Sequence, residues 1–108
     1  MARTTQAVKL KTTQEEAERI IKVNLTADGY KLIDYGGEDD VWKKGTGAMT
    51  SMHYIKPEFE YGDTLYLSGW VRTGMGDVAL KEQDLEGFGG IIPKKSVKAT
   101  MEKIIQSL

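Results

Sequence analysis

The chain has 108 residues, of which 40% are hydrophobic and 29% charged, and this is the size and balance of one ordinary globular domain. Its formal net charge of -1 at pH 7 disfavours nucleic acid and anionic membranes as partners, because it provides no attractive field. The absence of cysteine excludes disulfides, thiolate metal sites and cysteine nucleophiles. We therefore expect residues 1–108 to form a single domain without a metal ion or cofactor.

The apolar residues are too scattered for a targeting or membrane-spanning segment. The first residues contain no apolar core of the kind that a signal peptide carries. No apolar run approaches the roughly 18 residues that a spanning helix needs. We expect a soluble, cytoplasmic protein that does not bind membranes.

A helix is predicted soon after the start of the chain. Residues 1–12 are mostly polar, and they could form either a loose arm or an edge strand. Thr13 and Glu16 have capping-box spacing, in which the Thr13 hydroxyl accepts the Glu16 amide and the Glu16 carboxylate returns to the Thr13 amide. The apolar stripe of the predicted helix is formed by Ala17, Ile20, Ile21 and Leu25. Asp28 and Gly29 are predicted to end it.

Alternating apolar and polar residues predict strands in the middle of the chain. These strands cover residues 30–35, 53–61 and 64–72, and a further strand begins at Val41. A double glycine and the three acidic residues after it form the first turn. Because Pro57 cannot donate to a ladder, it should lie at a sheet edge, at a bulge or at a strand end.

A glycine-rich segment and a second helix complete the chain. Residues 74–90 could hold a fifth strand at 78–80, and they contain Leu85 and Phe88 as expected core residues. Ser96 is predicted to cap a helix with an apolar stripe formed by Val97, Met101, Ile104, Ile105 and Leu108. This order predicts an α+β fold of two layers, in which one helix at each end packs on one face of an antiparallel sheet of four or five strands.

The sheet face away from the helices is unusually aromatic. Tyr66 and Trp70 lie on it by alternation, and Trp42 is a further candidate. Three explanations are open: a curved sheet or residues 74–90 cover the rings, a second copy pairs through them, or they line a groove for a ligand or peptide. We favour a non-catalytic binding or assembly module, with a homodimer as one form, in which Trp42, Tyr66, Trp70 and Arg72 make the contacts. The alternative is a small-molecule or lipid carrier with a cavity between sheet and helix.

Other polar residues give weaker signals. Two lysine pairs could hold an anion at the start of the last helix, or could simply be solvated: Lys43, Lys44, Lys94 and Lys95. His53 is the sole histidine, and a zinc site there lacks familiar ligand spacing. An enzyme would require His53, Glu58 and Arg72 to converge in one pocket, and we predict no catalytic residue.

A family resemblance can be stated from several segments. Residues 37–47 read Gly-Glu-Asp-Asp-Val-Trp-Lys-Lys-Gly-Thr-Gly, residues 54–56 read Tyr-Ile-Lys, and residues 87–95 read Gly-Phe-Gly-Gly-Ile-Ile-Pro-Lys-Lys. Together with Trp70, this pattern resembles small uncharacterised bacterial domains, mainly of Gram-positive bacteria, some of which are attached to a zinc ribbon. The resemblance covers most of the chain from Thr13 onward. It implies a compact cytosolic domain but no functional residue, and the chain lacks the cysteines of a zinc ribbon.

Overall fold

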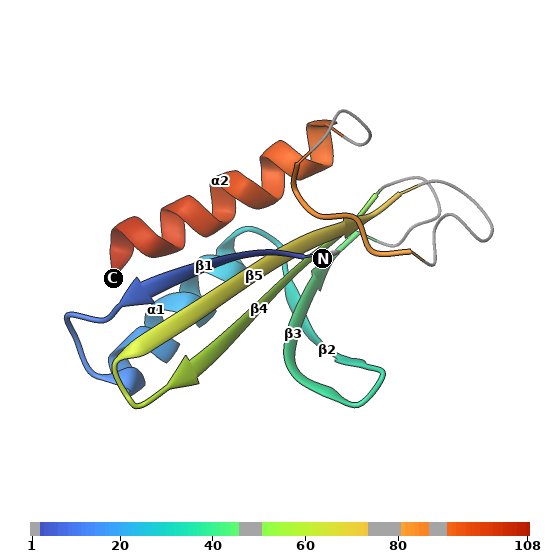
Figure 1. The fold of residues 1–108 in the computed structure, drawn as a ribbon. Helices are drawn as coiled ribbons and strands as arrows, with labels where there is room; N and C mark the ends of the chain where they lie inside the picture. The colour runs from blue at the N-terminus through green and yellow to red at the C-terminus, as the bar shows by residue number, and fades with distance from the viewer. Residues whose placement is uncertain (1–2, 46–50, 74–80, 87–90) are drawn as a thin grey trace.

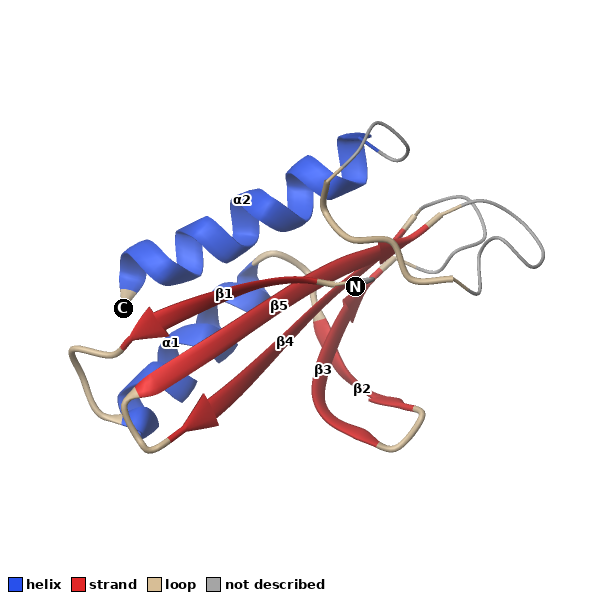
Figure 2. Cartoon of the chain, in the orientation of Figure 1, coloured by secondary structure: helices blue, strands red, loops and turns tan. Residues whose placement is uncertain are grey.

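The five strands in the described part of the chain form one antiparallel sheet. In the computed structural model, which describes residues 3–45, 51–73, 81–86 and 91–108, they are arranged in the order β1-β5-β4-β3-β2. The elements are β1 (Thr4–Lys9), α1 (Gln14–Ala27), β2 (Lys31–Tyr35), β3 (Glu38–Lys44), β4 (Met52–Glu60), β5 (Thr64–Arg72) and α2 (Ile91–Ser107). Both helices cover the same face of the sheet (Figures 1 and 2). The predicted two-layer α+β fold is therefore confirmed.

The edges of the sheet are formed by β1 and β2. Residues 4–9 pair with β5 from Thr4 opposite Gly69 to Lys9 opposite Thr64, so the edge-strand alternative holds for this segment. The predicted fifth strand at 78–80 and the expected core residue Phe88 lie outside the described residues. Neither described helix is long and apolar enough to cross a membrane.

Helix α1 begins where its capping residue predicts. The Glu16 amide donates to the Thr13 side-chain oxygen over 3.1 Å, which satisfies one of the free amides of the first turn. The prediction that the Glu16 carboxylate accepts from the Thr13 amide is wrong, because this carboxylate accepts from the Arg19 guanidinium instead. The cation one turn later competes successfully for the exposed carboxylate, which leaves only half of the capping box.

The end of α1 fixes the path into β2. Gly29 adopts a φ of 89°, as the predicted stop requires, and its amide donates to the Thr26 carbonyl. The Tyr30 amide returns to the Leu25 carbonyl over 2.9 Å, which completes a Schellman motif. Tyr30 and Leu25 are both buried in the main core, so this helix end is also a packing contact.

A tight hairpin joins β2 to β3. Gly36 and Gly37 both adopt positive φ, 59° and 84°, as a two-residue turn between twisted strands requires. Strand β3 begins at Glu38, directly after the turn, whereas the predicted strand began at Val41. Glu38 thus pairs with Tyr35, and an irregularity in the register between this pair and Val41 leaves Asp40 at a φ of 58°.

Pro57 occupies a locally free edge inside the sheet. Strand β4 pairs with β5 along its whole length, from Met52 to Glu60, but the ladder from β3 to β4 stops at Ile55. Beyond Ile55 the missing Pro57 amide removes no bond to β3. The alternative that Pro57 marks an edge strand is wrong, because β4 lies between β5 and β3. Proline is tolerated at this position because the pairing with β3 has already ended.

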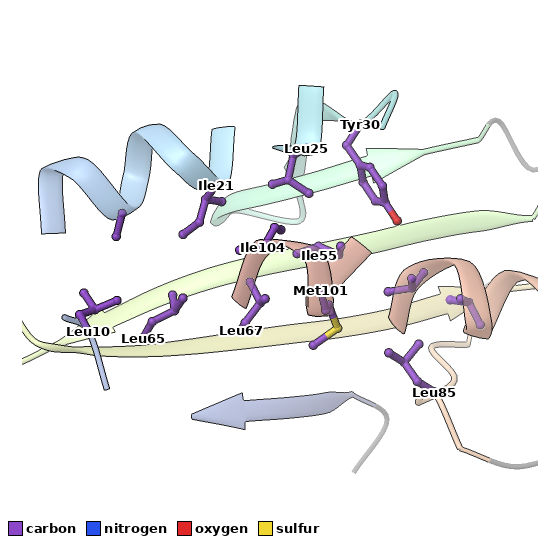
Figure 3. Close-up of a cluster of buried hydrophobic side chains, with 13 residues drawn as sticks. Leu10, Ile21, Leu25, Tyr30, Ile55, Leu65, Leu67, Leu85, Met101 and Ile104 are labelled. Carbon is purple, nitrogen blue, oxygen red and sulfur yellow. The ribbon is translucent and has the colours of Figure 1, made fainter. Parts of the chain in front are cut away.

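The main core fills the space between the sheet and the helices. Among the described residues it contains 13 that are buried (Figure 3): Leu10, Ala17, Ile21, Leu25, Tyr30, Ile55, Leu65, Leu67, Val71, Leu85, Val97, Met101 and Ile104. The predicted apolar stripes of both helices supply many of them. Leu85 is buried as expected, with 3% of its surface exposed. The two helices are therefore held mainly by burial of one face of each.

Helix α2 begins earlier than predicted. Its first residue is Ile91, so Pro93 lies in the first turn and Ser96 lies inside the helix. The expectation that Ser96 caps the helix is wrong. Proline is tolerated in a first turn because those amides have no helical partner, and the Ser96 carbonyl accepts the Thr100 hydroxyl over 3.2 Å.

Candidate functional site

A second, smaller cluster lies on the sheet face away from the helices. Tyr35, Tyr54 and Trp70, called here the aromatic trio, pack together with Val41. The rings of Tyr54 and Trp70 stack with their centroids 5.4 Å apart, and the Tyr35 ring is tilted against both. Trp70 is fully buried, with 0% of its surface exposed. The face is aromatic, as the sequence predicts, but its largest ring is covered.

Arg3 and two glutamates form the cover over Trp70. The Arg3 guanidinium carbon lies 3.7 Å from the centre of the Trp70 ring, and the same group forms ion pairs with Glu38 and Glu82. The Tyr35 hydroxyl donates to Glu82 over 3.0 Å. Glu82 belongs to residues 74–90, which the sequence analysis gave as one possible cover of the aromatic rings. No local sequence pattern indicated that Arg3 would also cover them. Trp70 therefore presents no surface to a partner in this conformation.

The other predicted contact residues lie in different places. Trp42 pairs with Ile55 and packs against the main core, so it faces the helices. Trp70 pairs with Tyr54 on the opposite face, and directly paired residues share a face. The suggestion that Trp42 joins the Trp70 face is therefore wrong.

The remaining two residues do lie on the face of the aromatic trio. Tyr66 is half-buried and lies four residues along β5 from Trp70. Arg72 donates to the Tyr54 hydroxyl over 3.5 Å, so it borders the trio. The four residues predicted as one contact surface are thus divided between two faces of the sheet.

Trp42 instead lines a groove between α1 and the ends of β3 and β4. The groove has a volume of about 230 Å³, and we call it the Trp42 groove; its lining residues are Glu18, Ile21, Lys22, Asp40, Trp42, Pro57 and Phe59. The apolar members form the floor, and the charged members stand at the rim. Pockets for drug-sized ligands usually measure roughly 300–1,000 Å³. This groove is therefore better matched to one large side chain than to a cofactor.

The predicted anion site is not assembled as the sequence suggested. Lys43 pairs with Tyr54 and so lies on the trio face, whereas Lys44 pairs with His53 and approaches the Tyr30 ring on the helix face. Lys94 is buried and donates to the Glu86 carbonyl over 2.7 Å. Because Lys43 and Lys44 face opposite sides of the sheet and Lys94 is bound to a carbonyl oxygen, the four lysines do not form one anion site, and we do not propose one.

His53 is half-buried, and the structure does not bring it together with Glu58, its predicted partner. Burial, and then the charge of Lys44, lowers the pKa of His53, so its imidazole is neutral at pH 7. His53 and Glu58 are an odd number of residues apart on β4 and face opposite sides of the sheet. Within the described ranges no group of three or more acidic or histidine side chains is placed to hold a metal ion.

Comparisons with protein-family models, curated proteins and solved structures find no match to this chain. The resemblance to small bacterial domains therefore stays a prediction. Any statement of function rests on the two features described above, which are the covered aromatic trio and the Trp42 groove.

The Arg3 contacts should make folding sensitive to acid. Hydrogen bonds from Arg3, with a smaller contribution from Lys56, lower the pKa of Glu38 from 4.5 to about 2. A carboxyl group whose pKa falls on folding stabilises the protein above its unfolded pKa, and this contribution is lost as the pH falls toward the folded value. Since the Glu38 side chain is 36% exposed, we reduce the full effect for solvent screening to about 1–2 kcal/mol.

Urea unfolding of wild type and Glu38→Gln between about pH 5 and pH 2 measures this contribution. We expect the free energy of unfolding of wild type to fall by about 1–2 kcal/mol more than that of the variant across this range. Glu58→Gln, which removes an exposed carboxylate of β4, is the matched control. Equal acid sensitivity of Glu38→Gln and wild type would contradict the assignment.

Proposed function

We propose that the protein is a non-catalytic binding module, and that it holds an apolar side chain of a partner peptide in the Trp42 groove. The observation that carries this proposal is the groove itself, in which half-buried Trp42 and Phe59 form an apolar floor beneath a charged rim. Partly exposed aromatic rings in a concave site are the usual anchors of protein recognition. The binding surface is therefore on the helix side of the sheet, at Trp42, and not at Trp70.

The groove also continues onto the free edge of the sheet. Leu32 of β2 pairs directly with Trp42, so both side chains lie on the same face. Leu32 is 58% exposed, and β2 has no neighbour on its outer side in the described sheet. An extended peptide could add to this edge and place every second side chain on the face that Leu32 and Trp42 share, where an apolar one can reach the groove.

A peptide is a better occupant than a carried small molecule or lipid. The carrier alternative needs an apolar cavity between the sheet and the helices, but the buried side chains of the main core fill the centre of this space. The opening of about 490 Å³ between β1 and α2 is lined mostly by polar residues, which suits a lipid poorly. The Trp42 groove has about 230 Å³, which suits one anchoring side chain. Its rim carries both signs of charge, so polar residues on either side of the anchor can pair with Lys22 or Asp40.

Selection of random peptides on the full chain tests the proposal. Peptides selected for binding to wild type should contain an aromatic or large aliphatic anchor, and Trp42→Ala should weaken their binding about 10- to 100-fold, as expected for a central aromatic anchor. Tyr61→Ala is the matched control, because Tyr61 is also aromatic but is 90% exposed in the turn after β4 and does not line the groove. Affinities are measured by isothermal titration calorimetry.

Selected peptides that bind Trp42→Ala as tightly as wild type would refute the groove as the contact site. Native mass spectrometry of wild type then distinguishes the remaining occupants. A homodimer that is lost in Trp42→Ala would make a second copy the partner, whereas a retained small molecule would favour the carrier. A cytoplasmic location, expected from the sequence, is compatible with each of these outcomes and is tested by cell fractionation.

A further inference from the structure

The guanidinium of Arg3 is bound by groups from distant parts of the chain. Its Nη1 and Nη2 donate to the two oxygens of Glu38 over 2.8 and 2.9 Å. Its Nε and Nη2 donate to the two oxygens of Glu82 over 2.8 and 2.7 Å. The Trp70 ring covers one flat side of the group at 3.7 Å. Two forked ion pairs and a stacked ring thus recognise the charge, the plane and the edges of one guanidinium.

The receptor groups are held in place by contacts other than those to Arg3. We call Tyr35, Glu38, Trp70 and Glu82 the Arg3 cage. The Tyr35 hydroxyl holds Glu82 over 3.0 Å, and Lys56 holds Glu38 over 3.1 Å. Trp70 is fixed by its stacking on Tyr54. A site with orienting contacts of this kind is preorganised for its ligand.

We propose that the Arg3 cage is a guanidinium-binding site, which Arg3 fills as a tethered ligand and which accepts the arginine side chain of a partner in its place. The chemical class follows from the geometry, because two carboxylates that each accept a pair of donors match a planar fork, whereas an ammonium is a single point charge. The cage is on the opposite face of the sheet from the Trp42 groove, so this proposal does not depend on the proposed function.

The attachment of Arg3 permits such an exchange. Arg3 directly precedes β1, an edge strand that pairs only with β5 in the described sheet. Arg3 lies outside the paired residues, which begin at Thr4, so its side chain can leave the cage while β1 stays paired and the Thr4 hydroxyl keeps its bond from the Leu85 amide. Once Arg3 has left, the two like-charged carboxylates lose the cation that lies between them and only Lys56 remains beside Glu38, so the site favours a new guanidinium.

Chemical rescue of Arg3→Ala tests the proposal. The thermal midpoint of the variant is measured against increasing N-ethylguanidinium, with N-ethylammonium at the same ionic strength as the control. We expect a saturable rise of about 5 °C at roughly ten times the dissociation constant of N-ethylguanidinium, and little or no rise with N-ethylammonium. Wild type should show no such rise, because Arg3 already fills the cage.

A second variant removes the receptor rather than the ligand. In Arg3→Ala combined with Glu82→Gln, N-ethylguanidinium should give no selective rise. Should Arg3→Ala not fold, Arg3→Lys takes its place, since it keeps a cation but cannot form the fork.

An arginine-containing tripeptide that rescues at lower concentration than N-ethylguanidinium indicates a peptide ligand, and equal potency indicates that only the guanidinium is recognised. Equal rescue by N-ethylammonium, no rescue at all, or rescue that survives Glu82→Gln would overturn the proposal.

Discussion

Replacing Gly69 with alanine is expected to lower the free energy of unfolding by about 2 kcal/mol. Gly69 lies in β5 beneath α2, and a β-carbon there would approach the Met101 sulfur to 2.5 Å and a Val97 methyl carbon to 2.9 Å. The methionine can move aside, but the branched valine has one strongly preferred rotamer in a helix. Removing glycine from a strand interior normally gains up to about 1 kcal/mol, so a net loss shows that the steric contact dominates.

Urea unfolding of four proteins isolates this contact: wild type, Gly69→Ala, Val97→Ala and the double variant. Val97→Ala creates room opposite Gly69, so the added methyl group should cost less in that background. The difference between the two costs is the interaction energy of the new methyl group with Val97. If Gly69→Ala costs the same with and without Val97, another contact limits the approach of α2.

The elements whose signals are local are those that the sequence predicts well. Thr13 at the start of α1 and Gly29 at its end act within a few residues of their own position, and both behave as expected. The alternating patterns of β4 and β5 also predict which side chains share a face. These features depend on backbone geometry that neighbouring residues determine. Local patterns are therefore sufficient for the two helices, for β2 to β5 and for much of the main core, whereas they left β1 open.

The arrangement of the candidate sites depends on contacts between distant residues, which local patterns do not contain. Arg3 and Glu82 are 79 residues apart in the chain yet share two hydrogen bonds. The face of Trp42 depends on its register with Ile55, and a shift of one residue reverses the face. No periodicity in a single strand contains that register, which explains why the sequence grouped Trp42 with Trp70.

Burial of Trp70 leads to the largest expected effect in the chain. Trp70→Ala should lower the free energy of unfolding by about 3–5 kcal/mol, because it removes a fully buried indole and leaves the Arg3 guanidinium without the ring that covers it. Unfolding is followed in urea by circular dichroism and by the fluorescence of Trp42, the other tryptophan of the chain.

Tyr66→Ala is the control for this prediction, since Tyr66 lies on the same face of the same strand but is only half-buried. It should cost less than about 1 kcal/mol, as is usual for substitutions outside the core. A large loss in the free energy of unfolding for Trp70→Ala alone would mean that the aromatic trio is a second core, which Arg3 covers. Similar small costs for both variants would mean that Trp70 is accessible in solution, and the sheet face that the sequence proposed as an interface would then become the better candidate for binding.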